Sequence, residues 1–308
     1  MPRIKEDPLA ALLARPSPKA KSLIFTVYGD AISHRGGDAA LGSVIALLQP
    51  LGVNERTVRT SMHRLAVEGW LQPRASGRRS DYRLTENGAR RVDAAHARIY
   101  HHASRPWDRG WTLVVLGATE LPAEVRQRLQ RELGWLGFGR LEGGLMLHPD
   151  PDDEALRSLL GDVQLRVLVL RGAAASWVAG DLLDEVVRKG WDIARLTADY
   201  EAFLADFRPL WQALQRGGEL EPERAFVART LLMHDYRRVL LRDPMLPDEL
   251  MPRHWPGAAA RTLCRSLYLR VQAGAERYIE SVLETAAGPA PGPAPSYLQR
   301  FGGLQSAA

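Results

Sequence analysis

The sequence has very little cysteine and lysine, and it lacks a long apolar run. Its one cysteine, Cys264, excludes an internal disulfide and a metal site with several cysteine ligands. No apolar stretch approaches the roughly 20 residues that cross a bilayer, and the first residues, MPRIKEDPLA, are charged where a secretory signal is apolar. We therefore expect a cytoplasmic protein with no membrane partner.

The rest of the composition is that of an ordinary globular protein. The chain has 308 residues, of which 45% are hydrophobic, and this length favours two or three domains. Its positive charge comes mainly from arginine and is unevenly placed: residues 1–110 carry 18 Lys/Arg against 10 Asp/Glu, whereas residues 111–308 carry 23 against 26. A basic N-terminal third is typical of a segment that contacts phosphates.

Residues 54–69 (NERTVRTSMHRLAVEG) have the pattern of an amphipathic helix with two defined ends. Asn54 can accept a hydrogen bond from a first-turn amide, and Gly69 tolerates the left-handed conformation that ends a helix. The helical period places Val58, Met62, Leu65 and Ala66 on one side and Arg56, Arg59, Thr60 and His63 on the other. One face is therefore suited to pack and the other to contact an anion, although a solvated surface helix has the same pattern.

The segments before this helix predict a helix-turn-helix. Residues 21–32 and 41–51 have the pattern of two further helices, and the turn at 50–54 leads directly into the next one. The first 18 residues contain four prolines, and we expect them to be mobile.

The segments after it predict a wing. Short strands at 70–74 and 81–84 flank a tip that contains glycine and two adjacent arginines, which suits contact with phosphates or the minor groove. We predict a winged helix-turn-helix over residues 19–84 that binds double-stranded DNA, with a protein-binding winged helix as the alternative. The predicted DNA-binding residues are Arg56, Thr57, Arg59, Thr60, His63, Arg64, Arg78 and Arg79.

The middle of the chain has a mixed pattern. A connector helix is expected at 85–105, and residues 106–174 then alternate strand and helix in the order βαββαβ, which predicts a ferredoxin-like domain. Residues 175–285 are helical in pattern and predict a C-terminal helical domain, so the fold class is α+β. The Ala/Gly/Pro-rich tail, 286–308, is expected to be disordered at least in part.

Three separated blocks resemble the PaaX family, repressors of phenylacetic acid catabolism. They are SLIFTVYGD to TENG at 22–88, WDRGWTLVVL at 107–116, and HDYRRVLLRDPMLPDELMPRHWPG at 234–257, in the order of the family. The resemblance covers about residues 20–285. It implies a dimeric repressor without a cofactor, which phenylacetyl-CoA releases from its operator.

A CoA thioester carries phosphates and an adenine, so its site needs cations and aromatic or apolar walls. One stretch offers such groups close together, and the predicted effector-binding residues are His234, Tyr236, Arg237, Arg238, Arg242 and Trp255. Asp235 could instead hold one of these arginines in a structural pair. The loop 242–256, with four prolines and several apolar residues, could serve as a packed clamp or as the wall of a pocket.

Three other functions compete with this one. A repressor of another aromatic or acyl-CoA pathway fits the same features. An acyl-CoA hydrolase would need a nucleophile with a base and an orienting acid, and the sequence shows no convincing set, since Cys264 and Ser266 have the neighbours of packed helical residues. A metal-dependent nuclease would need a carboxylate at the end of the first middle strand, where Leu116 to Thr119 stand instead. We therefore predict that the protein is not an enzyme.

Overall fold

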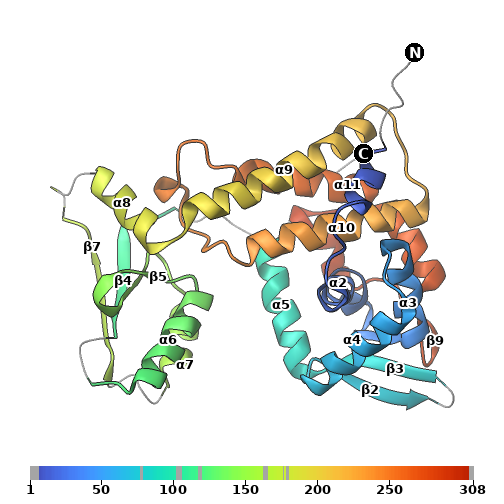
Figure 1. The fold of residues 1–308 in the computed structure, drawn as a ribbon, viewed down its shortest axis with the longest axis horizontal. Helices are drawn as coiled ribbons and strands as arrows, with labels where there is room; N and C mark the ends of the chain where they lie inside the picture. The colour runs from blue at the N-terminus through green and yellow to red at the C-terminus, as the bar shows by residue number, and fades with distance from the viewer. Residues whose placement is uncertain are drawn as a thin grey trace. The chain divides into compact units, whose positions relative to one another are not determined.

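The computed structural model describes residues 7–76, 79–101, 106–116, 120–161, 166–175, 177 and 180–304 (Figure 1). The chain forms two compact units. The first takes its described residues from 1–102, 201–240 and 258–308, and the second takes them from 103–200 and 241–257. The C-terminal helical region expected at 175–285 is therefore divided between the units, because apolar helix faces pair across distances that a local pattern does not reveal.

The first unit begins with helices and a small sheet. Its N-terminal half contains α1 (Pro8–Leu13), α2 (Ala20–Val27), the π-helix η1 (Tyr28–Ile32), η2 (Ser33–Arg35), β1 (Asp38–Ala40), α3 (Leu41–Leu48), η3 (Gln49–Leu51), α4 (Glu55–Val67), β2 (Leu71–Ser76), β3 (Arg79–Leu84) and α5 (Glu86–Tyr100). The three strands are antiparallel in the order β1-β3-β2. The hairpin of β2 and β3 follows α4 directly (Figure 1).

Local signals fix the ends of α4. The Asn54 side chain accepts a hydrogen bond from the Thr57 amide at 2.9 Å, and the turn before it uses Gly52 at φ 78°. Gly69 ends the helix at φ 73°, a conformation that glycine adopts without steric cost. On the packed side, Val58 and Met62 have no exposed surface.

The first unit is completed by segments from the other end of the chain. These are the C-terminal part of α9 (Ile193–Gln215), α10 (Pro222–Leu240), α11 (Gly257–Val282), the strand pair β8 (Glu284–Thr285) and β9 (Gly288–Pro289), and the 3-10 helix η7 (Pro295–Gly302). Helix α10 passes alongside α2 (Figure 1). The side chain of Ser43 on α3 donates to the carbonyl of Val282 at the end of α11, at 2.9 Å.

The described parts of the two terminal segments are more ordered than expected. Residues 8–13 form α1, where Leu9 and Leu12 are buried, although we expected a mobile segment up to residue 18. Residues 286–304 pack on the first unit, with Tyr297 and Arg300 each only 2% exposed, although we expected disorder. Composition misled in both cases, because a few buried side chains anchor segments that are otherwise rich in proline, alanine and glycine.

The second unit is a four-stranded antiparallel sheet with helices. Its elements are β4 (Gly110–Val115), α6 (Ala123–Trp135), β5 (Gly139–Arg140), η4 (Glu142–Gly144), β6 (Leu145–His148), α7 (Asp153–Leu160), β7 (Leu168–Ala173), α8 (Gly180–Gly190), the start of α9 and η6 (Asp248–Leu250). The strand order β5-β6-β4-β7 is that of a βαββαβ ferredoxin-like sandwich. The last strand of this order is β7, at the edge of the sheet beside β4.

Each face of this sheet has its own core. Val114 and Met146 pack with Leu129 and Leu133 of α6 on one face. Trp111 and Leu147 pack on the other face with residues of α8 and with Leu246 and Leu250 of the loop 242–256. The proline-rich loop is therefore part of the core of the second unit.

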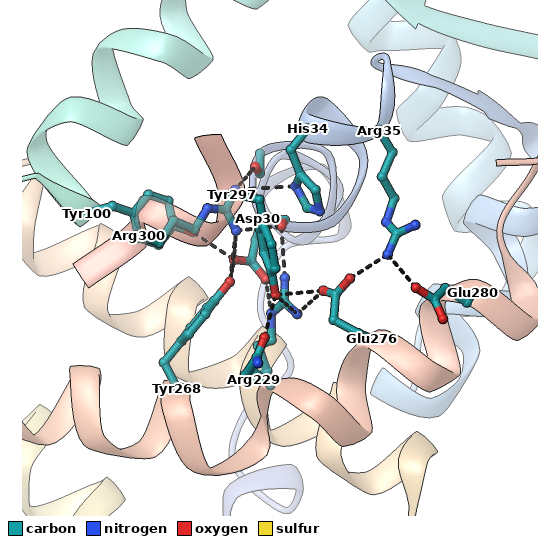
Figure 2. Close-up of polar contacts among 12 residues, drawn as sticks. Asp30, His34, Arg35, Tyr100, Arg229, Tyr268, Glu276, Glu280, Tyr297 and Arg300 are labelled. Atoms are coloured by element: carbon teal, nitrogen blue, oxygen red, sulfur yellow. Dashed lines mark hydrogen bonds and ion pairs between the residues drawn. The ribbon is translucent and has the colours of Figure 1, made fainter. Parts of the chain in front are cut away.

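A buried charge network holds the first unit together (Figure 2). We call it the Asp30 network, and it consists of Asp30, His34, Arg35, Tyr100, Arg229, Tyr268, Glu276, Glu280, Tyr297 and Arg300. The Asp30 carboxylate, in η1, accepts from Arg229 Nε of α10 at 2.6 Å and from Arg300 Nη1 of η7 at 3.1 Å. Arg229 also pairs with Glu276 of α11, so four distant segments meet here.

Charge compensation explains why these groups tolerate burial. Burial alone would raise the pKa of Asp30, but the nearby guanidinium groups of Arg229 and Arg300 outweigh it and lower the pKa from 3.8 to about 2. The hydroxyls of Tyr100 and Tyr268 donate to the same carboxylate at 2.7 and 3.0 Å. The carboxylate is therefore fully engaged, and loss of one partner leaves a buried charge without compensation.

We predict that Arg300→Met lowers the free energy of unfolding of the first unit by about 3 to 5 kcal/mol, the usual cost of breaking a buried ion pair from one side. Guanidinium denaturation followed by circular dichroism measures this change. The control is Arg90→Ala, which removes a solvent-exposed pair with Glu86 and should cost less than about 1 kcal/mol. Equal effects of the two substitutions would show that the tail does not support the unit.

Candidate nucleic-acid interface

The polar face of α4 is open to solvent along its whole length. The exposed side chains on α4 include all six of the predicted ones, which are Arg56, Thr57, Arg59, Thr60, His63 and Arg64. Their helix neighbours Val58, Ser61, Met62 and Leu65 are buried. Burial of one face fixes the helix, and the other face is left free to bind an anionic partner.

The charges on this face are only partly neutralised within the protein. Arg59 Nη2 lies 2.7 Å from Glu55 Oε1, one turn earlier, and both side chains are more than half exposed. Among the residues that the structure describes, Arg56 and Arg64 have no ion pair. An exposed pair of this kind is weak, so Arg59 can exchange Glu55 for another anion at little cost.

The predicted wing residues lie largely outside the described part of the chain. Strands β2 and β3 pair as far as Ser76 with Arg79, so Arg79 starts β3, but its side chain is not described. Arg78 is one of two residues between these strands and lies outside the described residues. Arg74 of β2 is a further exposed arginine on the hairpin, and the strand pattern alone did not single it out.

The predicted effector residues are divided between the two units. Four of them lie on α10 in the first unit, where His234 and Tyr236 are each 1% exposed, Arg237 is half-buried and Arg238 is exposed. Arg242 and Trp255 belong to the second unit. There Arg242 is exposed and pairs with Asp199 at 3.4 Å, and the Trp255 ring packs edge-to-face on Tyr200.

The buried members of this set have structural partners. His234 Nδ1 lies 3.2 Å from the hydroxyl of Thr26 on α2, and Arg237 Nη2 donates to the carbonyl of Ser22 at 3.3 Å. Asp235 makes the structural pair that the sequence left open, but its partner is Arg15, at 2.7 Å, and not a neighbouring arginine of α10. His234, Arg237 and Asp235 therefore attach α2 and the N-terminal segment to α10.

In the described part of the chain, no helix is both long enough and apolar enough to cross a bilayer.

Comparison with known proteins identifies relatives for almost the whole chain. Family models match in three consecutive blocks: PaaX-like protein at residues 19–88, PaaX protein central Cas2-like domain at 104–183, and PaaX-like protein C-terminal domain at 191–281. The "Transcriptional repressor PaaX" of Escherichia coli (strain K12) is 40% identical over 286 residues, which are 92% of this chain and 90% of that protein.

A solved structure is also similar. It is that of "Uncharacterized protein Rv0674 from Mycobacterium tuberculosis", with a TM-score of 0.50 and 25% sequence identity. The match covers 77% of this chain and 91% of the mycobacterial chain. The similarity therefore extends to much of the fold.

Two buried histidines of the first unit make its stability depend on pH. Burial, with help from Arg300, lowers the pKa of His34 from 6.5 to about 2, and burial, with help from Arg237, lowers that of His234 to about 3. Both stay neutral in the folded protein, whereas the unfolded chain binds a proton at each below pH 6.5. The free energy of unfolding is therefore unaffected by these histidines above the pKa of the unfolded chain. It falls as the pH drops below that value.

We predict that, at pH 5, each histidine lowers the free energy of unfolding by about 2 kcal/mol relative to neutral pH. Denaturant titrations at pH 7.5 and pH 5 measure the difference. In the double variant His34→Asn with His234→Gln, most of this pH dependence should disappear. Equal stability of the parent protein at the two pH values would show that these histidines become protonated in the fold.

Proposed function

The chain belongs to the PaaX family of transcriptional repressors, and we propose that it represses genes of phenylacetic acid degradation by binding operator DNA through α4. Membership in this family makes it a transcriptional regulator and not an enzyme. The observation that carries the DNA-binding proposal is the exposed arginine-rich face of α4, backed by a buried apolar face.

The arrangement around α4 suits a winged helix-turn-helix. Helix α3, the turn of η3 with Gly52, and α4 are consecutive, and the β2–β3 hairpin follows. In such a motif the second helix enters the major groove, where arginine forms paired hydrogen bonds to guanine, and the hairpin tip contacts the backbone. Arg56, Arg59 and His63 would then contact bases or nearby phosphates, and Arg78 and Arg79 would lie along the backbone.

We predict that Arg59→Ala weakens binding to the cognate operator by about 1 to 3 kcal/mol and relaxes base preference at one position, because a base contact is lost. DNA selected by the protein from a random library supplies the operator, and fluorescence anisotropy on base-substituted versions measures the preference. Arg208→Ala, an exposed arginine of α9 remote from α4 in sequence, is the control and should bind like the parent.

The wing substitutions should behave differently. Arg79→Ala should weaken binding to all sequences alike and lower the slope of affinity against salt by about one unit, since one phosphate contact is lost. If Arg59→Ala also weakened all sequences equally, this arginine would contact phosphate and the assignment of α4 as the base-reading helix would fail.

We also propose a homodimer formed through the second unit. Strand β7 is an edge of the sheet, yet its Leu168, Val169 and Leu170 are 46%, 36% and 47% exposed. An edge strand with exposed apolar side chains is a ready site for pairing with another chain, and soluble proteins usually protect such edges. A dimer would place two copies of α4 on one duplex. A winged helix needs such a second copy to bind DNA with high affinity.

We expect the parent protein to sediment as a dimer at micromolar concentration and the double variant Leu168→Asp with Leu170→Asp to sediment as a monomer, because two buried charges would oppose pairing. Analytical ultracentrifugation measures both. Leu298→Asp, with 43% exposure in the first unit, is the matched control and should remain dimeric. A dimeric β7 variant would exclude this edge as the interface.

The repressor is proposed to respond to phenylacetyl-CoA. An effector can release DNA only if it binds the DNA-incompetent arrangement more tightly, and typical couplings change affinity by about 5- to 150-fold. We predict a loss of operator affinity in this range with phenylacetyl-CoA, and none with phenylacetate or free CoA, because acyl group and phosphates must bind together. Gel-shift titrations with the three compounds decide this, and release by phenylacetate alone would contradict it.

A further inference from the structure

A cavity of about 500 Å³ lies inside the first unit, beside α10. Its walls come from the N-terminal segment around residues 12–19, from α2, from η3 immediately before α4, and from α10. Its volume is within the range of small-molecule sites, which is about 300–1,000 Å³. Neither the DNA-binding face of α4 nor the Asp30 network contributes to it.

The lining of the cavity combines apolar side chains with polar and positively charged ones. Leu12, Leu51 and Leu231 line it and are each 4% exposed. Lys19 and Arg238 also line it, but both side chains are exposed, and neither makes an ion pair with any residue that the structure describes. A mixed lining with three leucines and two available cations suits a ligand that has an apolar end and an anionic end.

The third cation of the lining has a structural task. Arg15 pairs with Asp206 of α9 and, at 2.7 Å, with Asp235 of α10. These pairs fasten the N-terminal segment over the cavity and occupy the one carboxylate in the lining. The charge offered to a ligand is therefore that of Lys19 and Arg238.

The position of the cavity connects it to the DNA-binding segment. Leu51 belongs to η3, the turn that precedes α4, and Ser22 belongs to α2, whose carbonyl accepts from Arg237 of α10. A ligand between α10 and these residues must therefore contact the turn that orients α4. Any ligand that fits best when the turn is displaced from α10 will oppose DNA binding.

We propose that this cavity is the effector site, with the acyl end of a CoA thioester among Leu12, Leu51 and Leu231 and its phosphates at Lys19 and Arg238. Occupancy shifts the turn 49–52 relative to α10 and so disfavours the DNA-binding arrangement. This inference rests on the proposed release by an acyl-CoA and names the place where that ligand acts. It retains Arg238 from the predicted set, adds Lys19, and assigns no ligand contact to Arg242 or Trp255.

The test is isothermal titration of full-length protein with phenylacetyl-CoA in the absence of DNA. The double variant Lys19→Ala with Arg238→Ala should bind at least about tenfold more weakly, since two charge-assisted contacts are lost. Lys19→Arg with Arg238→Lys keeps both charges and should retain most of the affinity. Arg208→Ala, an exposed arginine of the first unit outside the cavity lining, and Arg242→Ala, in the second unit, should bind like the parent.

The outcomes separate the two proposals. If the parent binds phenylacetyl-CoA and the alanine double variant binds it equally well, the effector is retained but this cavity is excluded. Weaker binding by Arg242→Ala alone would move the site to the second unit and also overturn the cavity. If the parent binds operator DNA but not phenylacetyl-CoA, the proposed effector itself fails, and the site proposed for it fails with it.

Discussion

The first unit depends on one carboxylate. Asp30 is buried, and a buried charge is costly unless oppositely charged groups and hydrogen-bond donors surround it. Arg229 and Arg300 supply these, and they come from α10 and from the end of the chain. Because both arginines are themselves buried, removal of any one of these three charges leaves a buried charge without full compensation. These ion pairs join η1, α10, α11 and η7, which are far apart in the sequence.

The orientation of α4 follows from this arrangement. Helix α2, which continues into η1 and so into Asp30, packs against α4 on one side and α10 on another. Polar contacts from α10, through His234 to Thr26 and through Arg237 to Ser22, attach α2 along its length. Helix α10 thus contacts both the helices of the proposed DNA-binding segment and the cavity. In the mechanism we propose, a ligand and an operator would compete energetically without sharing a surface.

Local features were predictable from the sequence, and long-range ones were not. The ends of α4 at Asn54 and Gly69, its two faces and the βαββαβ order depend on neighbouring residues, so spacing revealed them. The Asp30–Arg300 contact joins residues 270 apart, and no periodicity marks it. The same limit applies to the surroundings of the predicted effector residues. Arg238 and Arg242 are close in sequence but belong to different units, and the burial of His234 on α10 depends on segments distant in the sequence.

The contact between Asp30 and Arg300 also limits how early the first unit can reach its final electrostatic balance. The two residues are 270 positions apart, so the ribosome must add that length of chain before the second guanidinium can meet the carboxylate. Until then Asp30 has only Arg229 to compensate it in a buried site. Folding of the unit that carries α4 is therefore coupled to the synthesis of a segment far from α4 in the sequence.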